Sequence, residues 1–261
     1  MSNKISQLVD TLLKKMTIKE KVGQMTQVTL DMVLKGSVYE PEKPFAFDEK
    51  KLAEVLLENH VGSILNVPTS EALTRQQWYY VVSTLQEKAM KGSRLGIPVL
   101  YGIDSIHGAS YTKGTTFFPH QIGLAATWNP SIAKEQGAVT AYETRASSIP
   151  WVFAPVQDIA RTPTWSRIYE TFGEDPYLSG EMGKAMVNGF EGDDISRFDN
   201  VASCLKHFLG YGLPLSGKDR TPIWIPEHFL REYFLPSFQA ALDAGAKTIM
   251  INSGEINGVP V

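Results

Sequence analysis

Short apolar runs alternate with segments of helical periodicity along this chain, and that alternation limits its possible folds more than any other feature. Five apolar runs are predicted to be strands, at residues 61–67, 97–104, 151–158, 201–212 and 247–254. The predicted helices are at residues 5–16, 17–28, 48–57, 70–91, 129–146, 175–190 and 226–244. Five of these helices begin at a capping residue, namely Thr17, Asp48, Ser70, Asn129 and Asp175. Strands and helices in this order form βαβ units around a parallel sheet.

The lengths of the loops indicate which kind of parallel sheet this is. Loops that leave the predicted strands are long and polar, whereas those that enter them are short. This asymmetry is expected of a barrel whose ligand face lies at the C-terminal ends of its strands. A dinucleotide-binding fold is less expected, because no G-x-G-x-x-G follows the first strand and the sequence has no phosphate loop.

The run that begins at Val201 ends in Lys206 and His207 and then in a loop punctuated by glycines. The C-terminal end of a buried strand is where parallel α/β folds place their ligands. Adjacent residues of a strand point to opposite faces, so the two side chains serve one ligand only if the backbone bends between them. The alternative is a lysine that extends to solvent beside a capping histidine.

Polar side chains also follow other predicted strands. The set comprises Asp104, Arg167, Lys206, His207, Ser253 and Glu255. Each of these residues alone would be explained by a cap or a salt bridge. Together, a carboxylate that accepts from two hydroxyls and several fixed donors suit a polyhydroxylated ligand. No glycine-rich phosphate cradle and no carboxylate–histidine metal set accompanies them, so a sugar is favoured over a nucleotide or a metal-bound substrate.

The composition argues against several other classes of function. A formal net charge of −3 gives no basic surface for nucleic acid or an anionic membrane. One cysteine, Cys204, excludes an intrachain disulfide, and no run approaches the roughly 20 apolar residues of a membrane span. The first residues contain no apolar core of a signal peptide. That fits a cytoplasmic protein and equally one whose export signal has been removed, so the localisation is left open.

Six segments of the chain, in the same order, resemble glycoside hydrolase family 3, and in particular its β-glucosidases and exo-β-glucanases. They are TIKEKVGQM (17–25), YGIDSIHG (101–108), FAPVQD (153–158), WSRIYETFGEDP (165–176), KHF (206–208) and MINSGEINGVP (250–260). The resemblance implies the N-terminal (β/α)8 TIM-barrel-like domain of that family, with about five βα units in this chain. We expect a single domain in which residues 1–60 form a helical lead-in and residues 61–261 a partial barrel.

The resemblance also implies roles for the polar set at the strand ends. Asp104 matches the aspartate that binds two hydroxyls of the terminal sugar. Arg167 matches the arginine of a Trp-Gly-Arg motif, although serine replaces the glycine here. Lys206 and His207 match the pair that holds the same sugar. Ser253 stands where many members have a tyrosine, so it is a candidate substrate-binding residue to which no tyrosine role is assigned.

The two catalytic carboxylates of the family are expected to be missing from this chain. The nucleophile belongs to a Ser-Asp-Trp motif after the next strand, which this sequence does not contain, and the acid/base residue belongs to a second, C-terminal domain. Asp104 is not expected to replace the nucleophile, because its family role places it on the sugar hydroxyls. Glu170, Glu174 and Asp175 are expected to orient Arg167 and to cap the following helix.

The resemblance therefore implies the N-terminal part of a retaining β-glucosidase that needs no cofactor or metal. Its expected ligand is a β-glucoside or β-glucan oligosaccharide, and this chain alone is expected to bind sugar without cleaving it. The alternative is a carbohydrate-binding or self-assembling fragment with no enzymatic role. A partial barrel leaves sheet edges open, so the missing C-terminal portion or another copy of the chain is a candidate partner.

Overall fold

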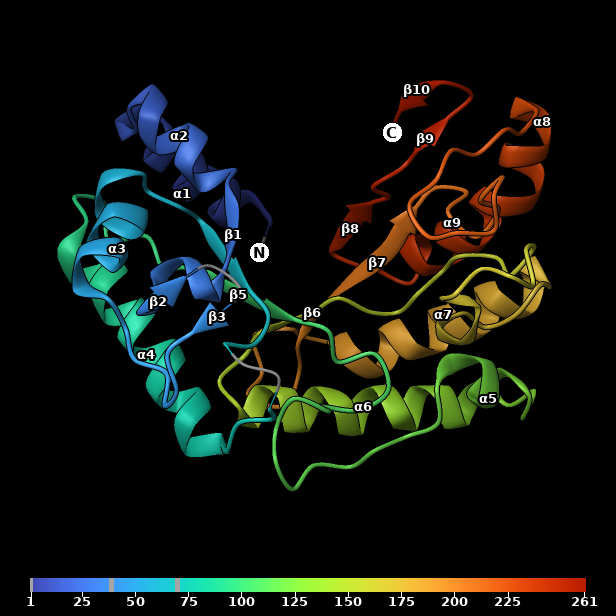
Figure 1. The fold of residues 1–261 in the computed structure, drawn as a ribbon, viewed down its shortest axis with the longest axis horizontal. Helices are drawn as coiled ribbons and strands as arrows, with labels where there is room; N and C mark the ends of the chain where they lie inside the picture. The colour runs from blue at the N-terminus through green and yellow to red at the C-terminus, as the bar shows by residue number, and fades with distance from the viewer. Residues whose placement is uncertain (1, 38–39, 69–70) are drawn as a thin grey trace. The chain divides into compact units, whose positions relative to one another are not determined.

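The computed structural model describes residues 2–37, 40–68 and 71–261 (Figure 1). The chain forms two compact units, Met1–Gly102 and Ile103–Val261, and each is described by itself. Both consist of parallel strands connected by helices, so the predicted α/β class with a parallel sheet is confirmed. The separate prediction of a helical lead-in up to residue 60 stays a prediction.

The first unit contains four α-helices and a three-stranded parallel sheet among its described residues. The helices are α1 (Ser2–Lys15), α2 (Ile18–Gln24), α3 (Glu49–Ala53) and α4 (Arg75–Gly92), with shorter turns at Leu30–Val33 and Glu54–Glu58. The parallel strands lie in the order β1 (Gln27–Thr29), β4 (Ser63–Leu65) and β5 (Leu100–Ile103). The short strands β2 (Gly36–Ser37) and β3 (Glu40–Pro41) pair antiparallel to each other.

An ion pair between a buried carboxylate and a partly exposed guanidinium fixes the start of α2 in the first unit. Thr17 and Glu20 form the predicted capping box, in which each side chain accepts from the backbone N–H of the other residue. The guanidinium of Arg94 donates to both Glu20 oxygens, at 3.0 and 2.6 Å. Hydrogen bonds from Arg94 and from Thr17 lower the pKa of Glu20 to about 2. One carboxylate therefore connects α2 to the segment that leads into β5.

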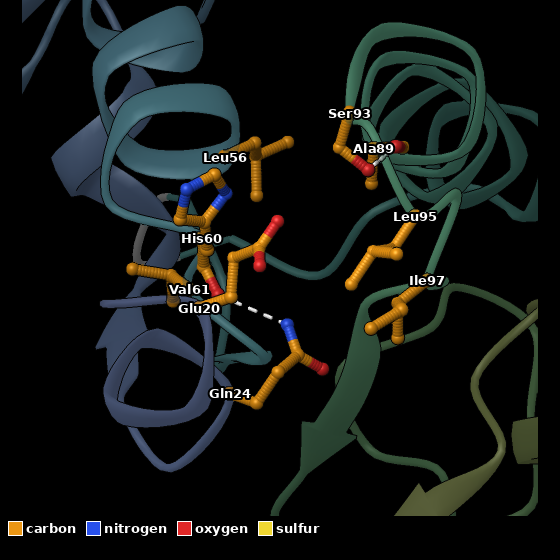
Figure 2. A pocket seen from close by; sticks show the side chains of 9 residues that line it. All are labelled: Glu20, Gln24, Leu56, His60, Val61, Ala89, Ser93, Leu95 and Ile97. Atoms are coloured by element: carbon orange, nitrogen blue, oxygen red, sulfur yellow. Dashed lines mark hydrogen bonds between the residues drawn. The ribbon is translucent and has the colours of Figure 1, made fainter. Parts of the chain in front are cut away.

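A small cavity lies beside this carboxylate (Figure 2). Glu20 points into it between His60 on one side and Leu95 on the other. The side-chain amide of Gln24 crosses below and donates to the backbone carbonyl of His60 at 3.0 Å. The cavity measures about 20 Å³, enough for a single water molecule, so it is a packing feature and is too small for a sugar.

Two predicted boundaries in the first unit are wrong. The helix expected to reach residue 28 ends at Gln24, and Gln27–Thr29 instead forms β1, which pairs with Ser63–Leu65. Tertiary pairing thus overrides a helical periodicity that continued through Met25. The helix expected from Ser70 begins at Arg75, because Thr74 supplies the capping box with Gln77; Ser70 itself lies outside the described residues.

The second unit carries the remaining strands and the longest pair of adjacent helices. Its helices are α5 (Gln121–Ala125), α6 (Pro130–Ala146), α7 (Pro176–Glu191), α8 (Glu227–Phe229) and α9 (Leu235–Asp243), with shorter turns at Ile168–Glu170 and Leu230–Phe234. Its strands are β6 (Trp151–Val152), β7 (Ala202–Phe208), β8 (Thr248–Ile251), and the short antiparallel pair β9 (Glu255–Ile256) and β10 (Val259–Pro260).

The sheet of the second unit is parallel, in the order β6–β7–β8. Ile103, the last residue of β5, accepts a hydrogen bond from the backbone N–H of Phe153 at 2.9 Å. The strand predicted at 151–158 is regular only at its first two residues, because Pro155 has no N–H to donate. The chain nevertheless follows β7 as far as Gln157, whose N–H donates to the carbonyl of Lys206 at 2.7 Å.

Two apolar clusters hold helices against this sheet. One lies among α6, α7 and β6 and includes Val152, Met182, Met186 and Phe190; the other lies among α7, α9 and β7 and includes Leu205, Ile223, Phe234 and Phe238. Helices α6 and α7 run side by side (Figure 1). The predicted caps Asn129 and Asp175 both accept from the first turn of their helices. The helices therefore fix the strand ends, where the predicted site residues lie.

Candidate functional site

The first part of the candidate site is an ion pair between two residues of the second unit, Asp104 and Lys206. Asp104 directly follows β5, and Lys206 lies near the end of β7. The Lys206 Nζ donates to Asp104 Oδ1 at 2.5 Å. The lysine side chain is 2% exposed and the aspartate side chain 27% exposed. The ion pair therefore joins an almost fully buried ammonium to a carboxylate that is partly accessible to solvent.

A second pair lies beside it, between His207 and Asp158. Asp158 Oδ2 lies 2.7 Å from the Nδ1 of His207 and accepts from the backbone N–H of the same residue at 3.0 Å. The side chains of His207 and Asp158 are 8% and 0% exposed, respectively. Burial lowers the pKa of His207, the neighbouring carboxylate opposes this effect, and the nearby cations Arg167 and Lys206 reinforce it. The net result is a histidine that favours its neutral form.

The backbone departs from regular strand geometry between Lys206 and His207. The peptide bonds Lys206–His207 and Phe208–Leu209 are both cis. The pairing of β7 with β8 changes register between Leu205 and Phe208, as expected of a strand that bends at Lys206–His207. Along this bent segment, Lys206 meets the carboxylate after β5 whereas His207 meets the carboxylate after β6.

Arg167 reaches the same region from the loop after β6. Its Nε and Nη2 each donate to a different oxygen of Glu170, both at 2.8 Å, so Glu170 orients the guanidinium as predicted. Burial alone would lower the pKa of Arg167, but the hydrogen bonds and the charge of Glu170 outweigh it and the pKa is raised. Asp175 instead caps α7 by accepting from the N–H of Leu178, also as predicted.

An aromatic side chain that sequence reasoning missed connects the arginine to the histidine. The centre of the Tyr211 ring lies 4.7 Å from that of the His207 ring and 5.7 Å from the guanidinium carbon of Arg167. Trp165 packs edge-on against Tyr211 at 5.2 Å and donates from its Nε1 to Asp219 at 3.0 Å. This packing fixes the plane of the imidazole and the position of the guanidinium.

Ser253 lies at the edge of this cluster and is exposed. Burial raises the pKa of Tyr211, and the neighbouring carboxylate of Asp219 adds to the rise. The hydroxyl of Ser253 and the guanidinium of Arg167 act on the pKa of Tyr211 in the opposite direction. The contacts therefore bring together four of the predicted residues, Asp104, Arg167, Lys206 and His207, while Asp158 and Tyr211 are additions to the predicted set.

The resulting arrangement offers both hydrogen-bond donors and acceptors to a ligand. Asp104 supplies carboxylate oxygens, and Lys206 and Arg167 supply cationic donors. Among residues 2–37, 40–68 and 71–261, no group of three or more His, Cys, Asp or Glu side chains is arranged to hold a metal ion. Within the same described residues, no helix is long and apolar enough to cross a membrane.

Comparison with known sequences shows which protein family this chain is similar to. Residues 17–261 match the family model described as the glycosyl hydrolase family 3 N terminal domain. A lysosomal beta glucosidase of Dictyostelium discoideum is 47% identical over 267 residues, which cover 97% of this chain and 32% of the relative. A periplasmic beta-glucosidase of Salmonella typhimurium is 32% identical over 252 residues, covering 97% of this chain and 29% of the relative.

Solved structures give the same result for the fold. A beta-glucosidase from Listeria innocua in complex with isofagomine superposes with a TM-score of 0.80 at 31% identity, covering 97% of this chain and 33% of that one. An exo-1,3/1,4-beta-glucanase mutant from a Pseudoalteromonas species superposes with a TM-score of 0.84 at 31% identity, covering 99% of this chain and 40% of that one. The fold is therefore TIM-barrel-like, as predicted, and the chain spans about a third of the length of the curated relatives that it matches.

Proposed function

The chain belongs to glycoside hydrolase family 3, and on that premise we propose that it forms the sugar-holding N-terminal part of a retaining β-glucosidase. Its ligand is the terminal, non-reducing β-glucosyl unit of a glucoside or a glucan oligosaccharide. The observation that carries this proposal is the convergence of Asp104, Lys206, His207 and Arg167 in one cluster of the second unit. No cofactor takes part in the proposed reaction.

The chemistry of the cluster supports a sugar as the ligand. Each hydroxyl of a sugar both donates and accepts, so a pocket for it needs acceptors and donors in close alternation. Asp104 is an acceptor that is part exposed, and the lysine that orients it is a donor. Arg167, held by Glu170, adds further fixed donors. Ordered groups of this kind lose little side-chain entropy when a ligand binds.

The names of similar proteins support glucose in particular. Several of the relatives carry the name beta-glucosidase, and the Listeria innocua enzyme has been solved with glucose and, as a mutant, with laminaribiose. Beta-xylosidases are also among the relatives, at 34% identity over 187 residues in one case. The proposal of glucose over xylose therefore rests on the higher identity to the Dictyostelium discoideum protein.

The carboxylates of the cluster support binding without cleavage by this chain. Retaining hydrolysis needs two carboxyl groups about 5–5.5 Å apart, one as nucleophile and one as proton donor. The carboxylates of the described cluster are each engaged by a fixed donor: Asp104 by Lys206, Asp158 by His207, Glu170 by Arg167, and Asp219 by Trp165. We propose that the two catalytic carboxylates come from outside this chain, as they would if it pairs with a further C-terminal portion.

Two measurements test the proposal. Glucose is expected to raise the unfolding midpoint of the purified chain more than sucrose at the same concentration, since sucrose acts only through exclusion from the surface. Equal shifts with the two sugars would contradict sugar binding. An aryl β-glucoside is expected to remain intact with the chain alone. Turnover that disappears in Asp104→Ala would show that the chain is catalytic by itself.

A non-catalytic fragment that assembles with itself is the competing interpretation. It predicts equal shifts of the unfolding midpoint with glucose and with sucrose, together with a mass in solution that rises with protein concentration. Sedimentation analysis of the same preparation measures the mass in solution and so distinguishes the two interpretations. If the chain binds sugar, glucose is expected to raise the unfolding midpoint more than sucrose does at every protein concentration.

A further inference from the structure

We infer that His207 accepts a hydrogen bond from the sugar and that Asp158 is the positioning residue that makes it an acceptor. The inference deepens the proposed function, because it names the polarity of one contact in the proposed sugar site. A histidine in such a cluster is otherwise interpreted as a donor, like Lys206 and Arg167. The two interpretations predict opposite preferences for the hydroxyl that faces the ring.

The position of Asp158 decides which ring nitrogen carries the proton. Asp158 Oδ2 accepts from the backbone N–H of His207, so this oxygen is an acceptor in the structure. The same oxygen lies 2.7 Å from Nδ1, and two acceptors do not attract each other, so Nδ1 carries a hydrogen. Because the Asp158 side chain is 0% exposed, solvent does not compete for this contact.

The surroundings of the ring keep the second nitrogen free of a proton. Burial lowers the pKa of His207, the cations of Arg167 and Lys206 act in the same direction, and the carboxylate of Asp158 opposes them. Tyr211, which packs on the ring, is an uncharged phenol at neutral pH, and burial raises its pKa further. A neutral ring with its hydrogen on Nδ1 has a lone pair on Nε2.

Nε2 is also the nitrogen that remains available. No hydrogen bond to it is formed by the residues that the structure describes, and it is not among their fully buried unpaired atoms. In contrast, Asp158 Oδ1 is such a buried atom. The site therefore holds two kinds of acceptor, Asp104 and His207, beside the donors Lys206 and Arg167.

The tautomer is tested directly by nitrogen NMR on the chain with labelled histidine. The chain has five histidines, and the signal that disappears in His207→Gln assigns the residue. At neutral pH we expect hydrogen on Nδ1 and none on Nε2. His107, whose Nδ1 lies 3.1 Å from the carbonyl oxygen of Phe118, provides an internal reference for the same tautomer. Hydrogen on Nε2 of His207, alone or on both nitrogens, would overturn the inference.

The role of Asp158 is tested in the same spectra. Asp158→Ala is expected to leave His207 as a mixture of its two neutral tautomers, because the acceptor for the Nδ1 hydrogen is removed. The matched change Asp243→Ala, at the last residue of α9, is expected to leave the signal unchanged. An unchanged tautomer in folded Asp158→Ala would remove its positioning role, and if that variant does not fold, the wild-type spectrum still decides the polarity.

The contact to the sugar is tested with glucose analogues in which one hydroxyl at a time is replaced by fluorine, which does not donate. For the analogue that lacks the hydroxyl facing His207, we expect the wild type to bind about tenfold more weakly than it binds glucose. In His207→Ala, the same replacement is expected to cause no such loss. The absence of any such analogue would refute the acceptor role. If glucose itself does not bind, the proposed function fails and the sugar contact with it, whereas the tautomer measurement stands independently.

Discussion

The ammonium of Lys206 lies 2.5 Å from a carboxylate oxygen of Asp104, although 102 positions separate the two residues in the sequence. The contact joins the end of β5 to the end of β7 within the second unit. It also fixes the orientation of the carboxylate that the proposed site offers to sugar hydroxyls. The pair therefore has a structural and a binding role, and the two are separable by experiment.

Asp104→Ala is expected to destabilise the chain by about 3–5 kcal/mol, because it leaves a buried ammonium without its partner. The Lys206 side chain is 2% exposed, so water does not replace the lost carboxylate. Urea unfolding measures the change. The control is Asp199→Ala, which breaks an ion pair to Arg197 with side chains 30% and 57% exposed and is expected to cost much less. Equal losses in the two variants would contradict the account.

Glu170→Gln is expected to weaken glucose binding and to destabilise the chain by about 1–3 kcal/mol, since Arg167 loses one of two charged hydrogen bonds. Calorimetry and urea unfolding measure the two effects. Glu227→Gln is the control, because its bond to Arg231 lies on an exposed helix surface and is worth about 0.3–0.5 kcal/mol. Unchanged glucose affinity in Glu170→Gln would show that the guanidinium does not need this support.

The sequence predicted the positions of these residues but not their pairing. Asp104 and Asp158 follow neighbouring strands in the same way, and nothing in their local sequence says which one meets the lysine. The choice depends on the register change in β7, which sends Lys206 to one carboxylate and His207 to the other. Such an irregularity is a property of the folded backbone and leaves no periodicity in the sequence.

Tyr211 was missed although the sequence carried a signal for it. The residue lies between Gly210, with a φ of +77°, and Gly212, where an added Cβ would meet the carbonyl oxygen of Ile159 at 2.1 Å. Two glycines with such requirements indicate a loop that is folded tightly against its neighbours. Strand β1 was missed for the opposite reason, since three residues are too few to show an alternation.

The stability of the chain is expected to fall as the pH is lowered from about 4.5 to about 2. The pKa of Glu20 is lowered from 4.5 to about 2 in the folded chain, where Arg94 and the backbone of Thr17 donate to it. Between these values the unfolded chain takes up a proton that the folded chain does not, so acid favours unfolding. Unfolding at a series of pH values measures this.

Glu20→Gln is the matched variant for the acid effect. Its stability is expected to be lower than that of the wild type at neutral pH and to fall less steeply between pH 4.5 and about 2, because the titrating group is gone. A parallel course for the two proteins would show that Glu20 does not carry the effect. The pKa of Asp48 is also lowered by backbone hydrogen bonds. Asp48 is present in both proteins, so its contribution to the loss of stability in acid is the same in each and cancels in the comparison.

Gly189→Ala is expected to destabilise the chain by about 1–3 kcal/mol, although alanine is the better helix former. An added Cβ would meet the carbonyl oxygen of Lys134 at 2.2 Å, so α6 and α7 would have to separate. In the control, Gly92→Ala, the Cβ would meet only the flexible end of Leu57 at 2.9 Å, and a smaller loss is expected. A stabilised Gly189→Ala in thermal unfolding would contradict the close helix contact.

The central claim is that this chain holds a sugar through Asp104, and calorimetric titration with glucose tests it most directly. Asp104→Asn is the appropriate variant, because the amide keeps the shape of the side chain and one acceptor for Lys206. We predict a saturable heat for the wild type, the same affinity for the control Asp243→Asn, and at least about a tenfold weaker affinity for folded Asp104→Asn. A folded wild type without saturable heat, or equal affinities for wild type and Asp104→Asn, would contradict the account.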